Sequence, residues 1–313
     1  MPGAVRAGGA TADAPRGSFT IEARGDFSLA AGIRFLEGFT PAAFEAGAPE
    51  RLEFAFALEG SWSTVGVSVE QTGATVRARV FARRPLTRAE LSAVRAQVAR
   101  ILSLDVDGGG FAAVGEHDAV VAGLQRRHPG LRPVCFWSWY EAAAWAIIGQ
   151  RVRMTQAAAI KAAMAEQLGA AVTVDGRVLH AFPAPGVLAE LAGFPGLTGV
   201  KVERLRALGE AARRNVFSSD SLRSMPREVA LEALRQLPGV GPFSAELILL
   251  RGAGAPDAAP VNEPRLARAV QHAYGLPGTP GPEEVERLSH GWAPYRTWVS
   301  LLLRVGAAEA AID

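Results

Sequence analysis

The sequence predicts an α+β protein, in which a small N-terminal antiparallel-sheet α/β domain precedes an all-α core of two subdomains. Two observations indicate this fold class. Residues 18–115 contain short segments in which apolar and polar side chains alternate, as in half-buried strands. From residue 116 onward, apolar side chains recur at helical spacing between prolines and glycines, and no strand pattern competes. The length of 313 residues suffices for both domains to have a hydrophobic core.

The N-terminal domain is expected to form a meander of strands with helices on one face. Residues 1–17 are small and rich in Gly and Ala, so we expect a disordered tail there. Gly60 and Gly73 indicate turns between strands, and Thr87 with Glu90 is a capping-box pattern at the start of a helix. The predicted strands cover residues 19–23, 52–58, 65–69 and 76–81, and the predicted helices cover residues 29–39 and 86–104.

The second domain, residues 116–313, is predicted to be entirely helical, with short helices that begin at or near proline. We see no internal repeat in it. The predicted helices cover residues 137–148, 155–168, 185–192, 202–216, 226–236, 242–250, 264–274, 282–288 and 295–305.

The composition excludes several classes of protein. The net charge is only +2, so any nucleic-acid site must be a local basic patch. Cys135 is the single cysteine, which excludes a disulfide framework and a four-thiolate iron–sulfur cluster. The five histidines show no metal-ligand spacing. No apolar run reaches membrane-spanning length and no signal peptide is evident, so we expect a cytoplasmic protein.

The most informative segment is Leu237-Pro238-Gly239-Val240-Gly241-Pro242, between two predicted helices. The glycines permit a tight turn, and Pro242 suits the first turn of a new helix. Such a hairpin directs unpaired N–H groups outward at the positive end of a helix, which suits a DNA phosphate. The glycines alone favour an ordinary helical hairpin over a phosphate site.

Several further motifs occur in order around this hairpin. They are Tyr140-Glu141, Ile147 and Gly149-Gln150-Arg151-Val152, then Gly199–Leu205, then Leu250-Arg251-Gly252 with Asp257, and finally Trp292–Trp298. Together with the hairpin, at residues 227–251, they resemble the helix-hairpin-helix DNA glycosylase superfamily, in its 3-methyladenine DNA glycosylase II branch, which repairs alkylated bases. The N-terminal domain also fits the mixed α/β domain of that branch.

The resemblance implies base excision repair on double-stranded DNA, with hydrolysis of the N-glycosidic bond of alkylated purines. Gly239, Val240 and Gly241 would hold phosphate through backbone N–H groups. Gln150 and Arg151 belong to the loop that would fill the gap left by a flipped base, with Arg151 as the wedge. The alternative for Arg151 is a solvated loop residue. Counting in register places the catalytic carboxylate at Glu263.

The resemblance also suggests walls for the base pocket. An electron-rich aromatic wall favours a cationic base, so Trp137, Trp139, Tyr140, Trp145 and Phe243 are candidates, with packing in the helix core as the alternative. Leu247, Pro264 and Arg304 occupy other family pocket positions. Phe243 stands where strand-cutting relatives have lysine, and Lys161 and Lys201 are the only lysines of the chain, so a monofunctional enzyme is expected.

The chain departs from the family pattern within this pocket. Glu263 replaces an aspartate, Pro264 an aromatic residue, Arg304 a tryptophan, and Leu247 a tyrosine. Three readings follow: an active glycosylase that uses Glu263, a DNA-lesion-binding protein that keeps the fold without the chemistry, or a globular protein with an unrelated glycine hairpin. Asp257 is expected to brace its loop or to act as a cap.

The resemblance implies no organic cofactor and no metal centre. Hairpins of this type also bind a monovalent cation through carbonyl oxygens, so the carbonyls near Leu237 and Val240 are a candidate Na⁺ or K⁺ site. We expect a monomer that associates with the nucleoid.

Overall fold

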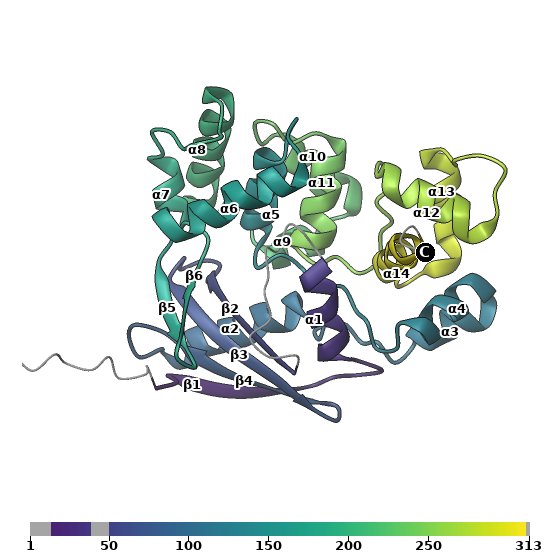
Figure 1. Ribbon diagram of the computed structural model, residues 1–313, viewed down its shortest axis with the longest axis horizontal. Coiled ribbons are helices and arrows are strands. Elements are labelled where there is room, and N and C mark those ends of the chain that lie inside the picture. Colours follow the sequence, from purple (N-terminus) through teal and green to yellow (C-terminus); the bar gives the residue numbers. More distant parts are fainter. Residues whose placement is uncertain (1–13, 39–49, 311–313) are drawn as a thin grey trace, which may run out of the picture.

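The computed structural model describes residues 14–38 and 50–310. Figure 1 shows a sheet at one end of the molecule and two groups of helices beyond it. The sheet is antiparallel, with strands in the order β1-β4-β3-β2, and the turn glycines Gly60 and Gly73 have φ values of +90° and +61°, as predicted. The strands are β1 (Gly17–Glu22), β2 (Arg51–Ala57), β3 (Thr64–Thr72) and β4 (Thr75–Phe81).

One face of the sheet packs on α1 (Leu29–Gly38) and α2 (Arg88–Ile101) and buries alternate residues of each strand in a single cluster. The predicted capping box is present at the start of α2. The Thr87 hydroxyl accepts from the Glu90 N–H at 3.2 Å, and the Glu90 carboxylate accepts from the Thr87 N–H at 2.9 Å. Most of the tail predicted for residues 1–17, and residue 39 of the first helix, lie outside the described residues.

The prediction that no strand follows residue 116 is wrong. A hairpin of β5 (Ala171–Val174) and β6 (Arg177–His180) packs on the other face of the sheet, where Val172 and Val174 join Ala55 and Phe81 in a small buried cluster. Its turn is Asp175-Gly176, and both residues have positive φ. Asp-Gly between alternating residues is a strong hairpin signal, but four-residue strands are too short to show clear periodicity.

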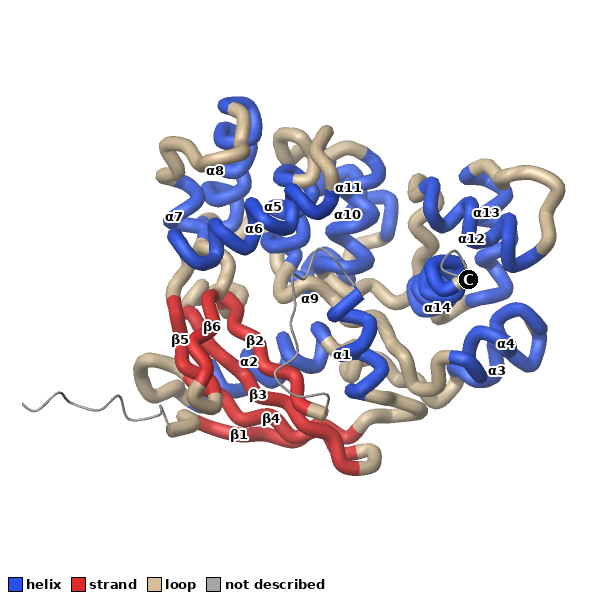
Figure 2. The backbone as a smooth tube through the Cα atoms, viewed as in Figure 1, coloured by secondary structure: helices blue, strands red, loops and turns tan. Residues whose placement is uncertain are grey.

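The helices form two hydrophobic clusters, which appear as separate groups in Figure 2. The first cluster is built from α5 (Trp139–Ile148), α6 (Met154–Leu168), α7 (Pro185–Ala189), α8 (Gly199–Arg213), α9 (Ser219–Ser224), α10 (Arg227–Arg235), α11 (Pro242–Leu247) and the π-helical turn η2 (Ile248–Gly252). The second is built from α3 (Phe111–His117), α4 (Ala119–Arg127), α12 (Pro264–Tyr274), α13 (Pro282–Ser289), the 3₁₀ turn η3 (His290–Trp292) and α14 (Arg296–Glu309).

The short helices α3, α4 and α9 were not predicted. Helix α3 crosses the predicted domain boundary at residue 116, and its Val114 is buried in the same cluster as α12 and α14. Over residues 14–38 and 50–310, no helix is long and apolar enough to span a membrane. Cys135 is buried as a free thiol.

Candidate functional site

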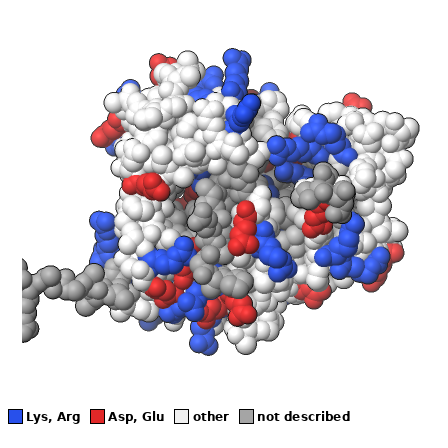
Figure 3. Space-filling model, in the orientation of Figure 1, with Lys and Arg blue, Asp and Glu red and all other residues white. Residues whose placement is uncertain are grey.

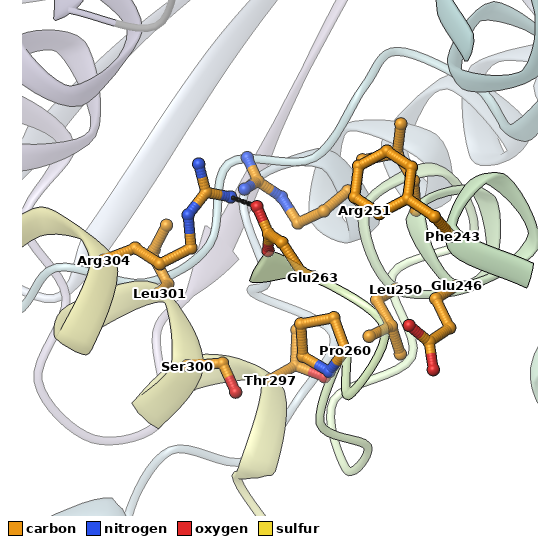
Figure 4. Close-up of a pocket in the computed structure, with 11 residues that line it drawn as sticks. Phe243, Glu246, Leu250, Arg251, Pro260, Glu263, Thr297, Ser300, Leu301 and Arg304 are labelled. Carbon is orange, nitrogen blue, oxygen red and sulfur yellow. Dashed lines mark ion pairs between the residues drawn. The ribbon is translucent and has the colours of Figure 1, made fainter. Parts of the chain in front are cut away.

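A small pocket lies where the two helical clusters meet, between α11, η2, the loop after η2, and α14 (Figure 4). Its cavity volume is about 40 Å³, which is room for a few water molecules at most and too little for a purine base. Mostly apolar side chains line it, with two carboxylates and two guanidinium groups among them. The lining residues are Phe243, Glu246, Leu247, Leu250, Arg251, Pro260, Glu263, Thr297, Ser300, Leu301 and Arg304.

The Glu263 carboxylate faces this pocket, at the residue that precedes α12. Its side chain is largely buried, and Oε1 lies 2.9 Å from Nη1 of Arg304 on α14. Figure 4 shows the guanidinium groups of Arg304 and Arg251 on the same side of the pocket, both directed toward Glu263. The pocket therefore contains an internal ion pair between Glu263 and Arg304.

Arg251 forms one wall of the pocket from η2. It is buried, donates to the Val134 carbonyl at 2.7 Å, and lies 5.2 Å from the centre of the Phe35 ring. Burial lowers the pKa of its guanidinium. Because an arginine of a lowered pKa still remains charged at neutral pH, Arg251 adds a fixed positive charge near Glu263.

The loop that carries Glu263 is held from two sides. Asp257 forms an ion pair with Arg296 at 3.1 Å, which agrees with its expected bracing role. From α11, the buried Glu246 carboxylate accepts from the Asn262 N–H at 3.1 Å and from the Asn262 side-chain amide at 2.9 Å. Sequence reasoning missed Glu246, and only its position three residues after Phe243, on one helix face, offered a signal.

The predicted hairpin is present between α10 and α11. Gly239 has φ of +86°, and a Cβ there would lie 2.5 Å from Arg204 Cδ, so glycine is required. Gly241 has φ of −95°, and a Cβ at this residue would have nothing within 4 Å, so its backbone does not require glycine. The tight turn therefore requires glycine at residue 239 but not at residue 241.

Of the three backbone N–H groups expected to bind phosphate, only two are free to donate. The Val240 N–H donates to the Leu237 carbonyl at 3.0 Å, so it is already used inside the hairpin. Within residues 14–38 and 50–310, the N–H groups of Gly239 and Gly241 have no hydrogen-bond acceptor. The expected role of Val240 as an N–H donor is corrected accordingly, because the turn consumes that group.

The loop between α5 and α6 lies against the hairpin. The Gln150 side chain donates to the Gly239 carbonyl at 2.7 Å and accepts from Arg204 of α8. Next to it, Arg151 is exposed and has φ of +54°, a conformation that few non-glycine residues adopt. Figure 3 shows Lys and Arg side chains gathered on this face, over the α10–α11 region and again between α11 and α12.

Two predicted pocket walls, Trp137 and Tyr140, lie elsewhere. The Trp137 ring stacks on Phe54 of the sheet, 4.4 Å between ring centres. Tyr140 is buried in the helical core, where its hydroxyl donates to the Pro183 carbonyl at 2.9 Å. Trp139 and Trp145 are also buried in that core, as their alternative reading expected. Of the predicted pocket residues, Phe243, Leu247 and Arg304 line the cavity, and Pro264 does not.

Neither lysine lies in the pocket. Lys161 forms a buried ion pair with Glu141 at 2.6 Å. Lys201 donates to the Ile148 carbonyl at 2.8 Å, where it meets the carbonyl end of α5. Burial lowers the pKa of Lys201. In the described part of the chain, no group of three His, Cys, Asp or Glu residues is placed to hold a metal ion.

Comparison with curated proteins gives distant relatives. The chain is 23% identical over 204 residues to the DNA-3-methyladenine glycosylase of Bacillus subtilis, which covers 64% of this chain and 67% of that protein. It is 29% identical over 213 residues to the probable bifunctional transcriptional activator/DNA repair enzyme AlkA of Mycobacterium tuberculosis, which covers 67% of this chain and 42% of that protein. The matched region is thus less than half of the second relative. No family model matches the chain.

Solved structures show the same fold over nearly the whole chain. The 3-methyladenine DNA glycosylase of Archaeoglobus fulgidus superposes with a TM-score of 0.75 at 21% identity, covering 92% of this chain and 97% of that one. The 8-oxoguanine glycosylase/lyase of Clostridium acetobutylicum, in complex with double-stranded DNA, gives a TM-score of 0.62 at 18% identity, covering 82% and 89%.

The sheet domain, the two helical clusters and the hairpin between them form the fold that these solved DNA glycosylase structures share. The curated relatives that it resembles in sequence are named as 3-methyladenine DNA glycosylases or as an AlkA DNA repair enzyme.

Proposed function

We propose that this protein is a monofunctional DNA glycosylase that hydrolyses the N-glycosidic bond of alkylated purines, of the 3-methyladenine type, in double-stranded DNA. The observation that carries the proposal is the largely buried Glu263 carboxylate, which faces an apolar pocket beside the hairpin. The DNA glycosylase names of the sequence relatives support the same assignment.

The reaction needs a negative charge at this place. Cleavage of the bond builds positive charge on the sugar, and a nearby carboxylate stabilises that charge and orients the attacking water. In the structure the Glu263 carboxylate is held at the pocket by its ion pair with Arg304. An alkylated purine is a good leaving group because it is already cationic, so the reaction requires little acid catalysis.

DNA would be held by the hairpin and by the loop between α5 and α6. The free N–H groups of Gly239 and Gly241 suit phosphate oxygens. Arg151 is exposed next to Gln150, which ties this loop to the hairpin, so Arg151 is positioned to fill the space of an extruded base. The carbonyls near Leu237 and Val240 remain our candidate Na⁺ or K⁺ site.

A base enters the pocket only if Arg304 moves, because the pocket is small and the ion pair occupies it. Phe243 is 46% exposed at the rim and presents its ring as a stacking surface. Strand cleavage is not expected, because Lys161 and Lys201 are both engaged outside the pocket and a Schiff base needs a free amine.

The test is an incubation of the purified protein with methylated duplex DNA. We expect free 3-methyladenine, abasic sites that break only after alkali treatment, and no release by Glu263→Gln. Release that is unchanged in Glu263→Gln would overturn the role of that residue.

The Arg304–Glu263 ion pair favours one second candidate, a lesion-binding protein without catalysis, because it fills the place of the base. Tight, salt-dependent binding to methylated DNA with no base release would identify that protein. No DNA binding at low salt would contradict both candidates.

A further inference from the structure

Glu246 is a buried carboxylate that the proposed chemistry does not use. It belongs to α11, the second helix of the hairpin, and is only 2% exposed. Burial raises the pKa of its carboxyl group, because desolvation disfavours the charge. Burial of a charged carboxylate costs desolvation free energy, so the group needs hydrogen-bond or ion-pair partners that compensate for it.

The partners of Glu246 are in the loop that carries Glu263. One oxygen accepts from the Asn262 backbone N–H at 3.1 Å, and the other accepts from the Asn262 side chain at 2.9 Å. Asn262 immediately precedes Glu263, so the two hydrogen bonds hold the residue from which the chain continues into Glu263.

Arg227 of α10 completes the arrangement. Its Nη2 lies 3.5 Å from Glu246 and donates to the Ala259 carbonyl of the same loop at 3.1 Å, while its Nη1 lies 3.3 Å from Glu286 of α13. Both helices of the hairpin therefore hold the loop, α10 through Arg227 and α11 through Glu246.

We infer that Glu246 is a positioning residue, which sets the place of the Glu263 carboxylate through Asn262 and so links the DNA-binding hairpin to the reacting group. The inference rests on the proposed function. A misplacement of about 1 Å costs on the order of 100-fold in rate. The longer side chain of Glu263, compared with aspartate, makes its starting point more important because it adds a rotatable bond.

The experiment compares Glu246→Gln with Glu286→Gln in the full-length protein. Both substitutions remove a negative partner of Arg227, but only the first replaces the acceptor of the Asn262 N–H groups. Two quantities are measured: the single-turnover rate of base release, and the Kd for a duplex that contains a tetrahydrofuran abasic-site analogue.

For Glu246→Gln we expect a rate roughly 10- to 100-fold lower, with an unchanged Kd, because the phosphate grip of the hairpin is intact. Glu286→Gln keeps the wild-type rate. Asn262→Ala, at an exposed residue, is the second variant in case Glu246→Gln does not fold, and it loses part of the rate because one of the two hydrogen bonds remains.

Hydrogen exchange of residues 257–263 tests the contact between Glu246 and Asn262 independently of base release. We expect faster exchange in Glu246→Gln and no change in Glu286→Gln. A wild-type rate and wild-type exchange in Glu246→Gln would overturn the inference, as would a Kd that weakens by the same factor as the rate. If the wild-type protein releases no base, the proposed function fails, while the exchange result still decides whether Glu246 holds the loop.

Discussion

Arg304 lies on the side of the pocket that a bound base must share with Glu263. Its guanidinium contacts the carboxylate at 2.9 Å, and the buried Arg251 adds a second positive charge nearby. A positively charged base a few ångströms from these two guanidinium groups is repelled by them, because the site is partly buried. With Arg304 in this position the pocket disfavours a cationic alkylpurine relative to a neutral base, so Arg304 has to move before a cationic base binds.

Replacement of Arg304 tests this barrier. For Arg304→Leu we expect faster release of cationic 3-methyladenine than of neutral hypoxanthine, relative to the wild type, because one positive charge is removed and the pocket opens. The measurement is the ratio of single-turnover rates on the two lesions in one duplex sequence. An unchanged ratio would show that Arg304 moves fully out of the pocket before the base arrives.

Within the helix-hairpin-helix element, the backbone requires glycine at residue 239 but tolerates a side chain at residue 241. Gly239→Ala places a Cβ against Arg204 at positive φ, so we expect lower stability and weaker DNA binding. Gly241→Ala has free space and an ordinary φ, so we expect unchanged stability.

Gly241→Ala should nevertheless weaken DNA binding, because the new methyl group lies beside the N–H that faces phosphate. The measurements are the melting temperature and the Kd for duplex DNA. Wild-type affinity of Gly241→Ala would contradict the proposed phosphate grip.

The loop between α5 and α6 depends on Gln150 for its contact with the hairpin. Gln150→Ala removes the hydrogen bond to the Gly239 carbonyl and the acceptor for Arg204. We expect about a tenfold weaker Kd for lesion DNA, close to the ~1.4 kcal/mol of one or two lost hydrogen bonds. Gln156→Ala, at an exposed residue of α6, is the control and should bind normally. Equal affinities for the two variants would show that the contact has no role in binding.

Local patterns predicted the strands of the sheet, the capping box at Thr87 and the hairpin, because each depends on neighbours in sequence. The pocket walls were harder. Helix α5 buries nine of its ten residues, so its pattern has no polar face to show which aromatic side chain points where. The prediction that Tyr140 lines the pocket, which depended on the resemblance, is wrong because its ring packs in the core. The bonds from Glu246 to Asn262 depend on tertiary structure that no local pattern reports.

At the scale of the whole molecule, Arg132 joins the sheet domain to the second helical cluster. Its buried guanidinium donates to the carbonyls of Asp26 at 2.9 Å and Ser103 at 3.1 Å, and lies 4.9 Å from the Trp298 ring centre on α14. Burial lowers its pKa. The side chain therefore satisfies carbonyl groups that would otherwise be buried without donors.

Arg132→Met should lower the free energy of unfolding by about 3 kcal/mol, because it leaves those carbonyl groups unpaired. Urea unfolding measures this change. Arg287→Met, at a side chain that is 72% exposed, should change stability by less than about 0.5 kcal/mol. A similar loss in both variants would show that Arg132 does not join the two parts in solution.

The central claim is that the Glu263 carboxylate is needed for base excision, whereas DNA binding by the rest of the protein does not depend on Glu263. Its most direct test is the single-turnover rate of 3-methyladenine release by the wild type and by Glu263→Gln, with the Kd of each for a tetrahydrofuran duplex. We expect the rate to fall at least ~100-fold and the Kd to stay the same. Equal rates in the two proteins would contradict the claim.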